Sequence, residues 1–300
     1  MKRCKTLLIF ALLGAFGAAL TLESARCVEA ARGALSLCAR TLVPTLFPFF
    51  VLSSLVVSCL GEALGTAAGG FMRALFGIGG AGGGALALGL LGGYPVGART
   101  AGELYRKGLL SRAESEQLLG FCGNCGAGFI LGFCGAGIFG STRAGAYLFL
   151  IHALSAILTG LLLRRRLPVS MAKPRRHSPS LAAAFPTAVT GSCHGMLNVC
   201  AFAVLFSVLL SLLPQPENAA LRAALFGFFE LTGGVAALPP TREGFVLCAA
   251  IVSWGGLSVH AQTLAALENT GLSLRRYFLG KALQTALSIP LALLAAARLY

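Results

Sequence analysis

The chain has 300 residues, of which 56% are hydrophobic and only 11% are charged. Soluble domains usually carry about 25% charged residues, so this composition excludes an ordinary soluble protein and indicates an integral membrane protein. All ten acidic residues are glutamates. The lack of aspartate excludes aspartate-based calcium loops, aspartyl-phosphate chemistry and catalytic triads that contain aspartate.

The formal net charge is +14. Nucleic-acid binding is one interpretation of such an excess, but it requires the basic residues to gather on one face. Here they flank apolar runs instead, as the positively charged cytoplasmic loops of membrane proteins do. We therefore expect a lipid bilayer as the partner and no nucleic acid.

Basic residues at the start of the chain precede a first apolar run, residues 7–22. A cleaved signal peptide has this layout, but no clear small-residue cleavage site follows and the rest of the chain is equally apolar. Charged residues then recur every three positions from Glu23 to Arg32, on one helical face. Residues 1–34 are predicted to form a transmembrane helix, with a cytoplasmic N-terminus, and an amphipathic segment.

Residues 35–163 form the first of two predicted repeats. An apolar run at residues 42–60 carries two prolines near its start, which bend or unwind a helix entry. Residues 65–93 are very rich in glycine, which suits closely packed membrane helices. Residues 144–163 are uninterrupted and long enough to cross about 30 Å of hydrocarbon.

Residues 164–184 form a predicted linker, and residues 185–300 form the second repeat. Six basic residues and no acidic residue lie between positions 164 and 180, so this linker is predicted to be cytoplasmic. The second repeat again shows long apolar runs, and Glu230 interrupts one of them.

Two short segments break apolar runs in a similar way, Gly92–Arg99 and Gly255–Gln262. The residues that follow also match: Thr100 with Thr263, Leu104 with Leu267, Gly108 with Gly271, and Leu109 with Leu272. Unwound backbone survives in a bilayer only where protein or a water-filled cavity satisfies it. Paired breaks in two related halves are typical of a transporter site near the middle of the membrane.

The predicted substrate-binding residues come from these breaks and from a third glycine-interrupted segment. They are Gly93, Tyr94, Pro95, Gly97, Arg99, Asn124, Gly126, Gly256, Ser258, His260 and Gln262. The alternative for each break is a helix kinked only for packing.

Several single residues allow two interpretations. Arg99 either pairs with a substrate carboxylate or reaches to lipid headgroups. Asn124 lies in a polar site or makes an interhelical hydrogen bond. Glu230 is a possible coupling residue, or it pairs with a basic side chain. His260 either titrates near neutral pH or packs as a hydrogen-bonded histidine, and His152 carries no site prediction.

No catalytic constellation accompanies these segments, so we predict no enzyme, no cofactor and no metal site. Cys122 and Cys125 have the spacing of a redox or metal motif, but no second pair and no histidine cluster accompanies them. We interpret them as small residues that allow helices to approach closely.

The three glycine-interrupted segments resemble the sporulation integral membrane protein YlbJ (SpoVV) family, which carries the nucleoside-recognition, or gate, domain. The likeness covers roughly residues 35–298. The family's Asn-x-Gly-Pro pattern reads Asn124–Ala127 here, with alanine in place of proline. The resemblance implies an integral protein of the outer forespore membrane that moves dipicolinate during endospore formation.

The sequence as a whole predicts an all-α polytopic membrane protein. We expect two related halves, as inverted repeats, in about eight helical segments of which some are broken or re-entrant. The predicted function is transport of a small polar or anionic solute, for which dipicolinate is the candidate by resemblance. The alternative is a non-transporting membrane scaffold needed for spore maturation. The sequence predicts no oligomeric state.

Overall fold

The computed structural model describes residues 2–165, 167 and 179–300, and within these residues every regular element is a helix. The first half contains α1 (Lys2–Leu22), α2 (Ser24–Leu37), η1 (Cys38–Leu42), α3 (Val43–Ala67), α4 (Gly69–Phe76), α5 (Gly82–Gly92), α6 (Val96–Arg106), α7 (Arg112–Cys122), η2 (Phe129–Ile138) and α8 (Thr142–Leu162). The second half contains α9 (Leu181–Ser211), α10 (Ala219–Phe229), α11 (Leu231–Ala236), α12 (Arg242–Trp254), α13 (Gly256–Ala266) and α14 (Arg275–Ala296). The predicted all-α polytopic class is confirmed.

Within the described residues, four helical stretches are long and apolar enough to cross a membrane: α8, α9, the run of α12 and α13, and α14. Helix α8 confirms the uninterrupted span predicted for residues 144–163. The α1 and α2 helices together add a fifth candidate, although they meet at 91°. Large apolar side chains of α1, such as Leu7 and Phe10, are exposed, as lipid-facing side chains are.

The described residues form more helical elements than the eight segments expected, because glycine, proline and polar residues divide the apolar runs. The helices on either side of Gly93 pack against each other as a hairpin, α5 with α6, and those on either side of Glu230 form a second hairpin, α10 with α11. Gly93 has a positive φ of 86°, which only glycine adopts readily. The following Tyr94–Pro95 peptide bond is cis.

The two halves place the same kinds of element in the same order. Each has a long helix (α3 or α9), a hairpin (α5–α6 or α10–α11), a helix broken near its middle (α7–η2 or α12–α13) and a closing helix (α8 or α14). The matched sequence segments therefore belong to elements of different kinds, since Gly92–Arg99 lies in a hairpin and Gly255–Gln262 in a broken helix. The inverted-repeat relation itself stays a prediction.

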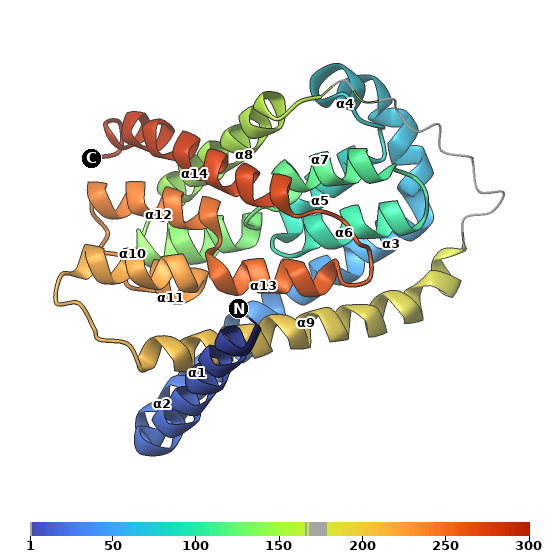
Figure 1. Cartoon of the computed structure of the whole chain (residues 1–300). Coiled ribbons are helices and arrows are strands. Elements are labelled where there is room, and N and C mark those ends of the chain that lie inside the picture. Colours follow the sequence, from blue (N-terminus) through green and yellow to red (C-terminus); the bar gives the residue numbers. More distant parts are fainter. Residues whose placement is uncertain (1, 166, 168–178) are drawn as a thin grey trace.

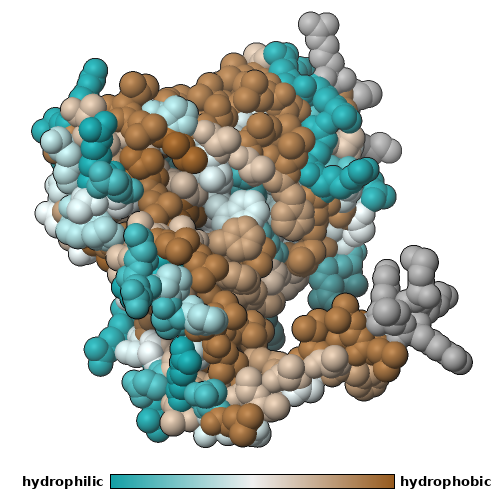
Figure 2. Space-filling view, turned by 60° about the vertical axis from the view of Figure 1, so that its left-hand side comes forward, coloured by the Kyte–Doolittle hydropathy of each residue, from teal (hydrophilic) through white to brown (hydrophobic). Residues whose placement is uncertain are grey.

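The hairpins and broken helices lie between two outer layers. In Figure 1, α8 and α14 cross the upper side, while α9, which packs on α2 and α3, crosses the lower side. Figure 2 shows an apolar surface between hydrophilic side chains that gather toward opposite edges of this face, the pattern expected of a membrane-embedded body. Helix α9 begins at Leu181, before the predicted boundary at 185, and linker residues 166 and 168–178 lie outside the described residues.

Candidate solute site

Three cavities follow one another along α9. The central cavity has a volume of about 50 Å³ and is lined by residues of both hairpins, both broken helices, α9 and the start of α3. Its lining residues are Leu42, Leu46, Gly93, Tyr94, Cys125, Gly126, Phe129, Val199, Ala203, Glu230, Leu231, Thr232, Val259 and Gln262. Both sequence-predicted breaks therefore contribute residues to one cavity.

The two outer cavities lie toward opposite ends of α9. The α6-side cavity has a volume of about 250 Å³, and its lining residues are Phe50, Pro95, Arg99, Glu103, Arg106, Gly191, His194, Gly195, Asn198, Val199, Gln262 and Ala266. The α2-side cavity has a volume of about 450 Å³, and its lining residues are Arg26, Ala30, Gly33, Ala34, Leu37, Ser207, Leu210, Ser211, Gln215, Phe226, Glu230 and Gly233. A helix rises 1.5 Å per residue, so Gly195 and Leu210 on α9 lie about 22 Å apart.

Single residues connect each outer cavity to the central one. Gln262 and Val199 line both the central and the α6-side cavity. Glu230 lines both the central and the α2-side cavity. These side chains are the boundaries that a solute passing along α9 would have to cross.

Each hairpin tip meets a glycine in the broken helix of its own half. A Cβ atom added to Gly93 would lie 2.8 Å from the nitrogen of Gly126, and one added to Gly256 would lie 3.2 Å from the Cα of Glu230. Both distances are shorter than ordinary van der Waals contact. The tips therefore approach the breaks closely because neither Gly93 nor Gly256 carries a side chain.

Glu230 caps the short helix that follows it. Its carboxylate accepts hydrogen bonds from the amides of Thr232 at 3.0 Å and Gly233 at 2.6 Å. The break predicted here is confirmed, since α10 ends at Phe229 and α11 begins at Leu231. Among the described residues no basic side chain forms an ion pair with Glu230, so the backbone supplies its polar contacts.

Tyr94 ties the first hairpin tip to the second half of the chain. Its hydroxyl lies 3.2 Å from the carbonyl oxygen of Val252 and 3.3 Å from that of Ser253. It also accepts a hydrogen bond of 2.6 Å from the Lys281 ammonium, which donates another of 2.7 Å to the carbonyl of Gly123. Sequence reasoning missed Lys281, although a lone lysine inside the last apolar run is the same kind of signal as Glu230.

Other residues of the protein supply hydrogen-bond partners for the polar groups at the break after α7. The side-chain nitrogen of Asn124 donates to the carbonyl of Phe121 at 2.9 Å, and its oxygen accepts from Gln284 at 3.0 Å. The amide of Cys125 donates to Nε2 of His152 at 2.9 Å. Asn124 is buried and lines none of the three cavities, so the structure supports its interpretation as an interhelical contact.

Arg99 lies against α9 and faces the α6-side cavity. Its guanidinium donates to Glu103 at 3.2 Å and to the carbonyl of Gly191 at 3.1 Å. A Cβ atom added to Gly195 would lie only 2.9 Å from Nη1 of Arg99. Glycines of α9 therefore make room for this side chain, which remains 23% exposed.

The remaining predicted site residues divide between cavity walls and packing. Pro95 lines the α6-side cavity, and Gln262, which donates to the hydroxyl of Ser258 at 3.3 Å, lines two cavities. Gly97 packs against the carbonyl of Cys122, where a Cβ atom would clash. Nδ1 of His260 lies 2.8 Å from the hydroxyl of Tyr277, as expected of a hydrogen-bonded packing histidine.

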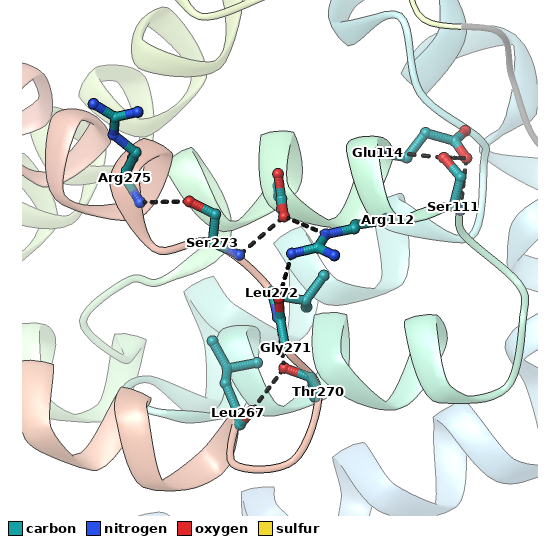
Figure 3. Close-up of polar contacts among 10 residues, drawn as sticks. Ser111, Arg112, Glu114, Leu267, Thr270, Gly271, Leu272, Ser273 and Arg275 are labelled. Atoms are coloured by element: carbon teal, nitrogen blue, oxygen red, sulfur yellow. Dashed lines mark hydrogen bonds and ion pairs between the residues drawn. The ribbon is translucent and has the colours of Figure 1, made fainter.

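The two halves are also joined through their connecting loops. Figure 3 shows Arg112, at the start of α7, bonded to the carbonyl of Gly271 in the α13–α14 loop. Glu116 accepts from Arg112 at 2.9 Å and from the amide of Ser273 at 2.9 Å. The hydrogen bond that Arg112 donates to Glu116 raises the pKa of Arg112. Beside them, Ser111 and Glu114 form a capping box at the start of α7.

Comparison with curated proteins finds a relative that covers most of the chain. The alignment is 28% identical over 302 residues, spanning 85% of this chain and 74% of the sporulation integral membrane protein YlbJ of Bacillus subtilis (strain 168). This likeness over most of its length supports the YlbJ family for the chain. No family model and no solved structure matches it. The nucleoside-recognition domain therefore stays a prediction for this chain.

Proposed function

We propose that this YlbJ-family protein is a membrane transporter for a small polar or anionic solute, with dipicolinate as the specific candidate. The observation that carries the proposal is the row of three cavities along α9, whose central member is lined by both hairpin tips and both broken helices. Midplane sites between broken helices of two halves are typical of secondary transporters. The name of the relative supports a membrane role in sporulation.

The size of the central cavity corresponds to a closed state of such a transporter. A volume of about 50 Å³ holds a few water molecules and no aromatic dicarboxylate. Loading therefore requires a hairpin tip to separate from the broken helix beneath it. The glycine contacts at Gly93 and Gly256 favour this movement, because no side chain interlocks there.

The side chains that line the three cavities suit a planar solute with a charged edge. Arg99, Arg106 and His194 line the α6-side cavity, and arginine pairs well with carboxylates. The central cavity combines an apolar wall with the polar groups of Tyr94 and Gln262, the usual composition of a small-molecule site. Dipicolinate, a flat ring with two carboxylates, has both features.

The basic stretch at residues 164–180 sets the proposed orientation. Positive loops face the cytoplasm, so the N-terminus and this stretch are assigned to that side. By family resemblance the membrane is the outer forespore membrane. In this role the protein moves its solute unchanged and acts without an enzymatic step.

An uptake experiment tests the proposal. The purified protein is reconstituted in liposomes that contain terbium ion, whose luminescence rises when dipicolinate reaches it. Wild type is expected to give a saturable signal above that of protein-free liposomes. Ala203→Phe fills the central cavity from α9 and is expected to abolish the signal, whereas Leu197→Phe places the same ring on a part of α9 that is 68% exposed and is expected to keep it.

The same experiment separates transport from the scaffold alternative. Folding of each variant is checked by its elution from a gel-filtration column and its melting temperature. A wild-type protein that is folded and inserted but moves neither dipicolinate nor related anions supports the scaffold instead. Equal uptake by wild type and a folded Ala203→Phe protein places the path elsewhere.

A further inference from the structure

The carbonyl ends of the interrupted helices α7 and α12 contact two buried side chains that are bonded to each other, Lys281 and Tyr94. Helix α7 ends at Cys122, and the next carbonyl, that of Gly123, accepts a hydrogen bond from the Lys281 ammonium at 2.7 Å. Helix α12 ends at Trp254, and its last carbonyls contact the hydroxyl of Tyr94, which itself accepts from Lys281 at 2.6 Å. Lys281 therefore contacts the end of α7 directly and the end of α12 through the Tyr94 hydroxyl, and the negative ends of both helices favour its positive charge.

The charge of Lys281 has no counter-ion among the described residues. Its side chain is 2% exposed, and both ion pairs of the described chain involve arginine. Its ammonium also lies 4.8 Å from the centroid of the Tyr94 ring, within range of a cation–π interaction. Burying an ammonium inside a membrane protein costs free energy unless protein dipoles replace the water that it loses. The carbonyl groups at the helix ends supply these dipoles.

Carbonyl ends of half-helices are the groups that hold coupling cations in transporters with broken helices. We propose that the Lys281 ammonium occupies such a cation position, so that this protein needs no bound alkali-metal ion at the break after α7. This inference rests on the proposed transport function. The inference adds that transport proceeds without sodium or potassium bound beside Lys281. Lys281 is then a positioning residue for the breaks after α7 and α12.

Melting temperatures in detergent test the inference independently of transport. Wild type is measured in sodium, potassium and choline chloride at equal ionic strength, and equal values are expected. Lys281→Ala opens a space beside the Gly123 carbonyl, and its melting temperature in choline is expected to fall by roughly 5–10 °C. Sodium, potassium or methylammonium is then expected to restore part of that loss in a saturable way.

Two matched variants make the result specific. Lys281→Met fills the same space with an apolar side chain, so none of these cations is expected to restore the melting temperature that this variant loses. Lys281→Arg keeps a fixed charge and is expected to remain insensitive to the choice of salt, even if Lys281→Ala fails to fold. A sodium- or potassium-specific stabilisation of wild type overturns the inference, as does a folded Lys281→Ala protein that melts equally in all four salts.

The outcome stays distinct from that of the uptake experiment. Absent flux in wild type contradicts the transport proposal and leaves the melting behaviour of Lys281 variants unaffected. Normal flux together with sodium-dependent melting of wild type contradicts only the role of Lys281.

Discussion

The two hairpin tips differ in what holds them. The first tip is bonded to the other half of the chain, because the hydroxyl of Tyr94 contacts α12 carbonyls and the Lys281 ammonium. The second tip is bonded mainly to itself, because Glu230 accepts from amides two and three residues further on. Both tips nevertheless rest on glycines in the same manner.

This difference suggests that the tips move with unequal ease. Separating the first tip from its surroundings exposes a buried ammonium and two carbonyls. Separating the second tip leaves its cap intact and breaks the packing of Glu230 on Gly256, together with one exposed hydrogen bond from the Trp254 indole to the carbonyl of Phe228. We therefore expect opening toward the α2-side cavity, which the second tip lines, to cost less free energy than opening toward the α6 side.

Removing the Tyr94 hydroxyl should give the largest effect on stability. Tyr94→Phe leaves Lys281 with one hydrogen-bond acceptor fewer, which typically costs about 1–3 kcal/mol in a buried site. A lower melting temperature in detergent would show this loss. Tyr147→Phe is the matched control, since that ring lies beneath Arg143 and away from the site. Equal melting of the two variants would mean that Tyr94 does not anchor the first tip.

Comparing alanine substitutions at two glycines separates the effect of the contact between Gly256 and the second tip from the effect of backbone strain. Gly256 and Gly271 both have positive φ, so alanine at either costs about 1–2 kcal/mol. Only at Gly256 would the added Cβ press on the hairpin, whereas at Gly271 it meets nothing within 4 Å. Gly256→Ala is therefore expected to destabilise the protein more and to reduce uptake, and equal effects of both variants would contradict the contact.

The places where helices break could be predicted from the sequence, because glycine, proline and a lone glutamate interrupt apolar runs at Gly93, Asn124, Glu230 and Gly256. The capping box at Ser111 is an equally local feature, because a serine and a glutamate three residues apart form it. What fills each break could not be predicted in this way. The partners of the α7 break lie on α8 and α14, and only the fold brings residues 158 or 160 positions away to Gly123 and Asn124.

The same limit explains how single residues were assigned. The amide of Asn124 in an apolar segment indicated either a polar site or an interhelical hydrogen bond, and Gln284 supplies such a bond across the helix interface. His152 carried no prediction, yet it accepts from the backbone of the break. A polar residue inside an apolar run therefore indicates a buried polar partner, and the sequence does not say whether that partner is protein or solute.

The cap of the second tip gives a smaller and more local prediction. Glu230→Ala removes the acceptor for two amides, and loss of such a cap typically costs about 1 kcal/mol. Asn218→Ala removes the cap of α10 and serves as the control, because Asn218 is exposed and away from the cavities. Similar loss of stability is expected for both variants, whereas only Glu230→Ala should alter uptake. Unchanged uptake by the Glu230→Ala variant would mean that Glu230 does not line the transport path.

Arg99 should affect stability least while still affecting transport. Its pair with Glu103 is partly exposed and four residues apart, an arrangement worth about 0.5 kcal/mol or less, so Arg99→Gln is expected to melt near wild type. Uptake of an anion through the α6-side cavity should fall, and its dependence on ionic strength should weaken, because a charge at the entrance is lost. Arg143→Gln changes a charge outside the three cavities and should alter neither property. If both variants transported equally at low and high salt, the anion would not enter past Arg99, and the α2-side cavity, which Arg26 lines, would become the better candidate for its entrance.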